Sequence, residues 1–191
     1  MKIRTPWWLV ILCFLAIPTV VAAGKTPAVG DRLVDLRLPM PESADTRDYL
    51  GLPPGNSFSV TAIAGKILVI EIFSMYCPHC QREAPAINRL YQAIQDSEPL
   101  RDRVKMIGIG VGNSTFEINH FRKHYSILFP LFPDEDFTIH KAIGEVRTPF
   151  FIVAALGPNG NGRILWTGSG SMGALETFMA RLNDLAKDGA P

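Results

Sequence analysis

Two cysteines separated by Pro78 and His79 follow shortly after an apolar run, Ile67 to Phe73. Such a run is typical of a strand buried on both faces of a sheet. A proline suits the first position of a helix, where its missing N–H costs nothing. Cys77 and Cys80 are therefore expected at a strand-to-helix turn, where they can close a small disulfide. The positive end of that helix would favour the thiolate form of Cys77.

The alternative interpretation of this motif is that the two cysteines form half of a zinc site. Zinc usually takes four protein ligands in a structural site, and the sequence has no second cysteine pair. The spacing therefore favours redox chemistry, in which one sulfur attacks a substrate disulfide and the second releases the substrate by closing the ring. No metal and no cofactor is expected.

Residues 1–23 read as a secretory signal peptide. Lys2 and Arg4 precede an apolar stretch, and small residues end at Ala23. The apolar core is short for a membrane span, which needs about 20 residues. An uncleaved N-terminal anchor is the alternative, with membrane contact only in that case. The third cysteine, Cys13, lies inside this leader, and the bulky Leu12 before it argues against lipid attachment.

Export makes the remaining cysteine pair more informative. After removal of the leader, Cys77 and Cys80 are the only cysteines left. An exported protein with a single CxxC has no separate structural disulfide, so its pair is better explained as catalytic. The expected location is the periplasm or another extracytoplasmic space.

Charge excludes little but does bear on partners. The formal net charge is +1, and removal of the two basic residues of the leader takes it to −1. A nearly neutral chain gives no support for binding to nucleic acid. The length suits one domain with a full core.

Hydrophobic periodicity predicts an α/β domain with a mixed central sheet flanked by helices. Four parts are expected: the leader, an N-terminal extension with a β-hairpin over 24–65, a domain over 66–187, and a tail over 188–191. The expected strands are 33–38, 58–63, 67–73, 104–111, 129–132, 150–155 and 164–167. The expected helices are 78–96, 115–125, 136–143 and 172–186, and Pro85 should kink the first of them.

The chain resembles the thioredoxin superfamily, and most of all its exported TlpA-like branch, which includes the cytochrome c-maturation thioredoxins. The resemblance covers about 66–187 and implies a thioredoxin fold. Four features carry it: the cysteine pair after a buried strand, a carboxylate six residues before the first cysteine, a proline five residues after the second, and a Thr-Pro opening the third buried strand. In this sequence they are Cys77 with Cys80, Glu71, Pro85, and Thr148 with Pro149.

The active-site segment resembles a different branch. Its Pro78-His79 dipeptide is similar to that of the periplasmic dithiol oxidases of the Dsb type. Those oxidases insert a long helical domain before their cis-proline, and the interval from Cys80 to Pro149 is too short to hold one. The direction of electron flow therefore stays open, with a slight preference for reduction because the whole-domain resemblance is to the TlpA-like branch.

Each residue of the motif has an expected role. Cys77 is expected to be the nucleophile and Cys80 the resolving thiol. A partly charged His79 would lower the pKa of Cys77 further; the alternative is an exposed surface histidine. Pro78 would be purely structural.

Two residues outside the motif complete the expected site. Glu71, alone in an apolar strand, should be partly buried and able to take the proton from Cys80; the alternative is a solvated residue at the sheet edge. The resemblance implies a cis peptide bond between Thr148 and Pro149, with the Thr148 backbone pairing with a substrate strand. An ordinary strand-initiating proline is the alternative.

The sequence thus predicts an exported thiol–disulfide oxidoreductase that acts on protein substrates. A reductase would need electrons from a membrane partner, since the chain has no nucleotide-binding glycine motif. A peroxiredoxin-like peroxidase is a second hypothesis, favoured by Ser74 and disfavoured by Ile70, where that family has proline. A copper-binding module that uses both cysteines and a histidine is a third. His120 and His124 have a metal-ligand spacing, but no HExxH pattern accompanies them.

Overall fold

The computed structural model describes residues 24–157 and 162–187. The predicted leader, the middle of the predicted turn over 157–162 and the predicted tail lie outside the described residues. The strands are β1 Arg37–Pro39, β2 Ser57–Ser59, β3 Ile67–Phe73, β4 Val104–Val111, β5 Leu131–Asp134, β6 Phe150–Ala155 and β7 Arg163–Ser169. The helices are α1 Ala44–Leu50, the 3-10 helix η1 Val60–Ala62, α2 Pro78–Asp96, α3 Glu98–Arg101, α4 Thr115–Tyr125, α5 Thr138–Ala142 and α6 Leu175–Lys187.

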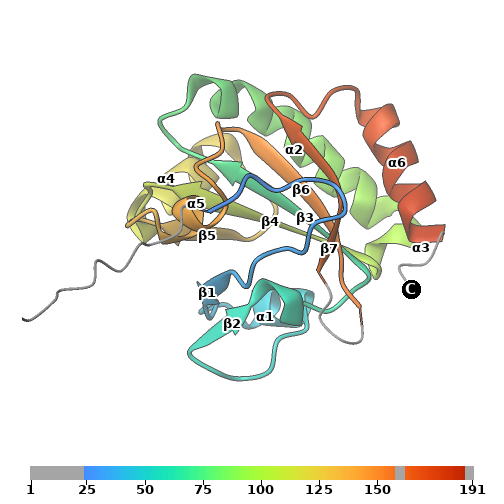
Figure 1. Ribbon diagram of the computed structural model, residues 1–191, viewed down its shortest axis with the longest axis horizontal. Helices are drawn as coiled ribbons and strands as arrows, with labels where there is room; N and C mark the ends of the chain where they lie inside the picture. The colour runs from blue at the N-terminus through green and yellow to red at the C-terminus, as the bar shows by residue number, and fades with distance from the viewer. Residues whose placement is uncertain (1–23, 158–161, 188–191) are drawn as a thin grey trace, which may run out of the picture.

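A five-stranded mixed sheet forms the centre of the molecule, in the order β5-β4-β3-β6-β7 (Figure 1). β3 pairs in parallel with β4 and antiparallel with β6, while β5 and β7 form the two edges. All seven residues of β3 are buried, as expected for an apolar strand covered on both faces. The predicted α/β class with a mixed sheet flanked by helices is confirmed.

Helices α2, α4 and α6 cover one face of the sheet. Their buried side chains recur at helical spacing and pack with alternate residues of the strands. This core includes Val69, Phe73, Cys80, Ile87, Phe121 and Phe178. α2 runs through Pro85 without ending there, so the carboxyl half of the helix stays packed on the sheet. The cysteine pair is thereby built on a long, well-anchored helix.

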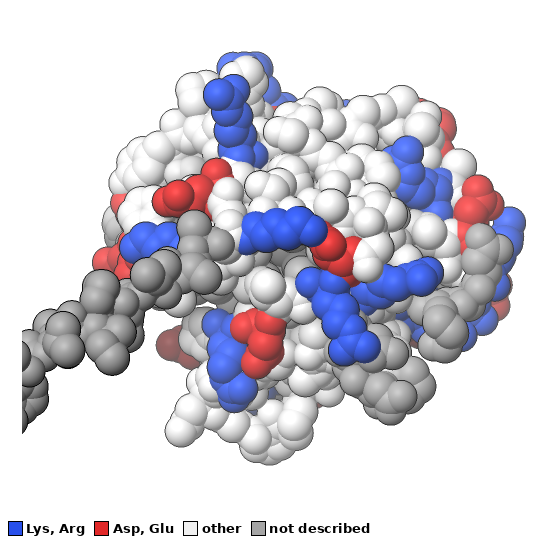
Figure 2. All heavy atoms as spheres, viewed as in Figure 1, with Lys and Arg blue, Asp and Glu red and all other residues white. Residues whose placement is uncertain are grey.

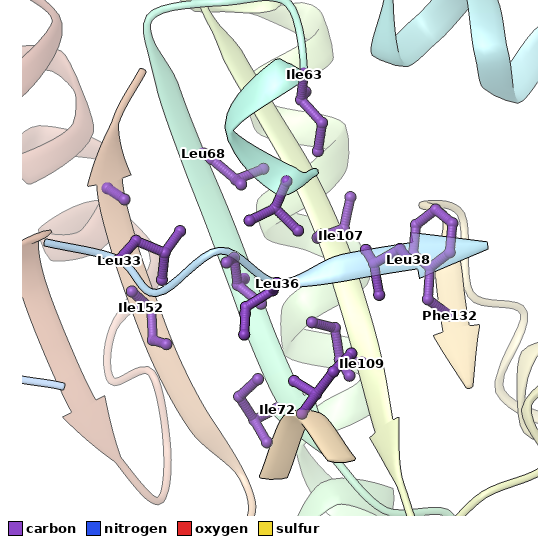
Figure 3. Packing of buried hydrophobic residues seen from close by; sticks show 14 of the residues in the cluster. Leu33, Leu36, Leu38, Ile63, Leu68, Ile72, Ile107, Ile109, Phe132 and Ile152 are labelled. Carbon is purple, nitrogen blue, oxygen red and sulfur yellow. The ribbon is translucent and has the colours of Figure 1, made fainter. Parts of the chain in front are cut away.

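The N-terminal extension covers the opposite face (Figure 1). Figure 3 shows Leu33, Leu36 and Leu38 lying across the strands, close to Ile107 and Ile152. These three leucines are buried, with Leu36 only 2% exposed. Burial of apolar side chains on this scale contributes roughly 2 kcal/mol for each one. The extension is therefore part of the core and no loose appendage.

The extension differs from the predicted hairpin in its details. β1 and β2 do pair antiparallel, but over three residues each. Between them lies α1, a helix that the periodicity did not predict. The hydroxyl of Ser43 accepts a hydrogen bond from the N–H of Thr46 at its start, and Gly51 takes a left-handed φ of 63° at its end. Beyond β2 the chain turns into η1 and does not continue as a strand to Ile63.

Surface charge is mixed in the view of Figure 2, where Lys and Arg side chains and Asp and Glu side chains are scattered over a mostly uncharged face. Within 24–157 and 162–187, no helix is both long enough and apolar enough to cross a bilayer.

Candidate active site

Cys77 occupies the N-cap position of α2, with φ −81° and ψ 114°. Its N–H donates to the carbonyl of Ser74 at 3.0 Å, which turns the chain from β3 into the helix. Pro78 follows at the first helical position, as predicted. The Cys77 thiol is partly exposed and donates to the backbone carbonyl of Thr148 at 3.3 Å.

The pKa of the Cys77 thiol lies below its ordinary value. Partial burial by itself raises this pKa, but hydrogen bonds with the Thr148 side chain and with the backbone N–H groups of Cys80 and His79 outweigh it. The N–H groups at the start of a helix stabilise a negative sulfur because they have no partner within the helix. Cys77 is therefore the thiol better prepared to attack.

Cys80 lies one turn further along α2, and its side chain is fully buried. Burial raises the pKa of its thiol far above the ordinary value, and the nearby Glu71 carboxylate and Cys77 sulfur raise it further. Cys80 consequently remains a neutral thiol until a base removes its proton. The two cysteines of one short motif thus differ in both exposure and acidity.

Glu71 lies in the centre of the sheet, where it is opposite Gly108 on β4 and Phe151 on β6. Because side chains alternate along a strand, it shares the α2 side of the sheet with Val69 and Phe73. Only 3% of it is exposed. Burial, together with the nearby Glu83 and Cys77, raises its pKa to about 8. The alternative of a solvated residue at the sheet edge is wrong.

The Thr148–Pro149 peptide bond is cis, as the resemblance implies. It immediately precedes β6 and brings the Thr148 carbonyl beside the sulfur of Cys77. The segment before the third buried strand therefore meets the segment after the first one, although 71 residues separate them.

The imidazole of His79 does not bond to Cys77. Its Nδ1 lies 2.9 Å from a terminal nitrogen of Arg82. Guanidinium nitrogens only donate, so Nδ1 is the acceptor in this contact. The bond from His79 to Cys77 comes from the backbone N–H instead. The predicted effect of a charged His79 on Cys77 stays a prediction.

Three residues that sequence reasoning missed hold the turn before Cys77. The N–H of Met75 donates to Oδ1 of Asn113 at 2.8 Å, and the carbonyl of Met75 accepts from Nε2 of Gln81 at 2.8 Å. The hydroxyl of Tyr76 donates to the carboxylate of Glu117. A polar side chain just after a strand, such as Asn113, was the only available signal.

The two histidines of α4 are exposed and stack on each other. His120 and His124 stack with ring centroids 6.2 Å apart. Across the described part of the chain, no cluster of three or more His, Cys, Asp or Glu residues could hold a metal ion.

Comparison with known proteins places this geometry in a family. The AhpC/TSA family matches residues 29–164, which is well over half of the chain. The chain belongs to the AhpC/TSA family. This redoxin family lies within the thioredoxin superfamily, so the predicted resemblance is confirmed. The match begins inside the N-terminal extension, in agreement with the packing of that segment on the sheet.

Individual members of the family are distant in sequence. The thiol-disulfide oxidoreductase ResA of Bacillus subtilis is 25% identical over 175 residues, covering 89% of this chain and 85% of the relative. ResA of Halalkalibacterium halodurans is 25% identical over 118 residues, covering 62% of each protein. With that relative the chain therefore aligns over less than two thirds of the relative's length. The crystal structure of StoA from Bacillus subtilis has a TM-score of 0.53 at 20% identity, covering 68% of this chain and 90% of StoA, which supports the fold alone.

Proposed function

We propose that this chain is an extracytoplasmic thiol–disulfide oxidoreductase that exchanges disulfides with protein substrates through Cys77 and Cys80. One observation carries the proposal: the two sulfurs of the motif differ sharply, one partly exposed with a lowered pKa and the other buried with a raised pKa. Disulfide exchange needs such a difference, because one sulfur must be accessible to the client while the other stays protonated until the mixed disulfide has formed. The name thiol-disulfide oxidoreductase given to distant relatives supports it.

In the reducing direction, the Cys77 thiolate attacks one sulfur of a client disulfide. A bond forms between Cys77 and that sulfur, and the second client sulfur leaves as a thiolate that takes a proton from water. The negative charge on Cys77 is then gone. Since that charge helps to hold the pKa of Glu71 up, its loss makes the carboxylate form of Glu71 more accessible.

Glu71 and Cys80, which are both buried, carry out the resolution of the mixed disulfide. The Glu71 carboxylate accepts the proton of Cys80, directly or through a water. The Cys80 thiolate attacks the sulfur of Cys77, and the first client sulfur leaves and is protonated. The client ends with two thiols and the chain with a Cys77–Cys80 disulfide, so the electron count balances. The reverse sequence oxidises a client dithiol.

We favour the reducing direction, with a membrane partner that returns two electrons to the disulfide. Thr148 and Pro149 would bind the client backbone, because the Thr148 carbonyl already lies beside the reacting sulfur. Pro78 and His79 would act through the backbone at the start of α2, where they position N–H groups around Cys77.

Trapping tests the order of attack. The Cys80→Ala variant should accumulate mixed disulfides with clients through Cys77, whereas Cys77→Ala should accumulate none. Capture by the second variant and not the first would overturn the assignment. An equilibrium titration against glutathione sets the direction: a reducing pair supports a reductase, and a strongly oxidising pair supports a Dsb-type oxidase. Consumption of peroxide by Cys80→Ala would instead support a peroxidase.

A further inference from the structure

Two large aromatic side chains are exposed beside the redox motif. Tyr76, which directly precedes Cys77, is 63% exposed, and Phe116 on α4 is 79% exposed. Both line one open groove, whose other walls include Met75, Glu117, His120 and Glu135. Scattered apolar residues are common on protein surfaces, but a pair in one groove next to a reactive group points to a binding surface.

The packing of α4 does not require Phe116 to be aromatic. The core-facing side chains of this helix are Ile118 and Phe121, which are buried, while Phe116 lies on its exposed side. Tyr76 is tethered, because its hydroxyl donates to the carboxylate of Glu117. The ring of Tyr76 is therefore fixed at the groove without being covered, and binding against it loses little side-chain entropy.

Charge in the groove is negative. Glu117 accepts hydrogen bonds from the N–H and the hydroxyl of Ser114 as well as from Tyr76, and these bonds lower its pKa. It therefore stays a carboxylate near neutral pH. Glu135 supplies a second carboxylate, in an exposed position after β5. The complement of such a groove is an apolar side chain together with a basic one.

We propose that this groove binds the part of a client protein that flanks its reacting cysteine, and that it selects a segment with an aromatic or large aliphatic residue and a Lys or Arg. The inference rests on the proposed function and adds the substrate class. Met75 and Tyr76 lead directly into Cys77, so a client sulfur bonded to Cys77 places the neighbouring client residues within reach of the groove. The Thr148 carbonyl beside the same sulfur gives the client backbone a second contact.

Short peptides test the selection. Each carries one cysteine bonded through a disulfide to thionitrobenzoate, flanked by Phe and Lys, by Phe and Glu, or by Ala and Glu. The Cys77 thiolate of the Cys80→Ala protein attacks the peptide sulfur, and the coloured thionitrobenzoate leaves. We expect the Phe and Lys peptide to react about fivefold or more faster than the Ala and Glu peptide, with the Phe and Glu peptide between them.

Two double variants test whether the groove is the part of the protein that selects among the peptides. Phe116→Ala combined with Glu135→Gln should bring the rate ratio of the two extreme peptides close to one. The matched control is Val29→Ala with Glu176→Gln, which removes another exposed apolar side chain and another exposed carboxylate elsewhere and should keep the ratio. Because the readout is a ratio within each protein, a general loss of folded material does not alter it.

The possible outcomes distinguish a failure of client selection by the groove from a failure of the proposed disulfide exchange through Cys77. If the Cys80→Ala protein with an unchanged groove reacts with all three peptides at one rate, or if the groove variant keeps the full rate ratio, the groove does not select clients. If the parent protein reacts with none of them, disulfide exchange through Cys77 itself is refuted.

Discussion

The side-chain oxygen of Asn113 accepts the backbone N–H of Met75 at 2.8 Å, joining the segment after β4 to the turn that carries Cys77. Asn113 is fully buried. It also lies against Gly110, where an added Cβ would approach Oδ1 to 3.1 Å. Gln81 of α2 holds the carbonyl of the same Met75. The peptide before the redox motif is thus fixed from two elements at once.

Asn113 is therefore expected to be a positioning residue for Cys77. Asn113→Ala should slow disulfide exchange about tenfold, since small displacements of a reacting group are costly. It should also raise the pKa of Cys77, measured from the thiolate absorbance as a function of pH. The loss of one buried hydrogen bond should lower the free energy of unfolding by about 1 kcal/mol. Asn119→Ala, on the exposed side of α4, is the control and should change none of these three quantities.

A loss of stability with an unchanged pKa of Cys77 would assign Asn113 a purely structural role.

Thr148 provides a second test of how the thiolate is stabilised. Thr148→Val removes the hydroxyl while keeping the shape, and should raise the pKa of Cys77 because the thiolate loses one hydrogen bond, worth about 1 kcal/mol. Thr148→Ser keeps the hydroxyl and should preserve the lowered pKa. The rate of iodoacetamide labelling as a function of pH measures both. An equal rise in the two variants would show that the hydroxyl alone does not set the pKa of Cys77, because Thr148→Ser keeps it.

Glu71 should make stability depend on pH. The folded chain holds its proton up to about pH 8, whereas the unfolded chain releases it near the ordinary value of 4.5. Between those values the folded state binds more protons, so the free energy of unfolding falls as the pH rises. The full cost is on the order of 5 kcal/mol. Glu71→Gln, which mimics the neutral acid, should remove this fall.

Urea unfolding of the reduced protein at several pH values within this window measures the difference. Parallel pH profiles for the parent and Glu71→Gln would contradict a raised pKa.

The same substitution should slow resolution. Without a carboxylate to accept the proton of Cys80, a mixed disulfide on Cys77 should persist about a hundredfold longer. Initial attack by Cys77 should change less, and rapid-mixing kinetics with a fluorescent client peptide separate the two steps. If both steps slow by the same factor, Glu71 acts on Cys77 and not on Cys80.

The buried strands and the long helices follow from the sequence because apolar residues run continuously through the strands and recur at helical spacing in the helices. Ile67 to Phe73 is wholly apolar except for Glu71, and the observed strand has those same bounds. α1 was missed because its seven residues bury only Leu50, so no apolar stripe marks it. Ser43 and Gly51, which cap it, were the readable signal. β5 begins at Leu131, later than predicted, because its register follows from pairing with β4.

The site was only partly readable for a different reason. The cysteine motif and Glu71 stand within one short stretch of sequence. Asn113 and Glu117 reach that stretch only through the parallel pairing of β3 with β4, which brings the ends of two strands together. Contacts across about forty residues leave no local pattern, and the resemblance named no residue at these positions.

The extension offers a last test. Leu36→Ala should lower the free energy of unfolding by about 3 kcal/mol, because it leaves a cavity against the sheet. Val34→Ala, at a position 42% exposed, should cost less than about 0.5 kcal/mol. Chemical denaturation compares them. Equal, small effects would show that the extension is dispensable and that the domain begins near residue 66.

The concealment of Cys80 within α2 has a consequence for any molecule that meets this protein. Of the two cysteines that the structure describes, only Cys77 is accessible for a disulfide with another protein. A bound protein cannot control its own release through the buried Cys80 thiol, because the reaction of that thiol depends on groups inside this protein. The lifetime of the mixed disulfide is therefore controlled by the interior of this protein, whereas the selection of the bound protein is controlled by its surface.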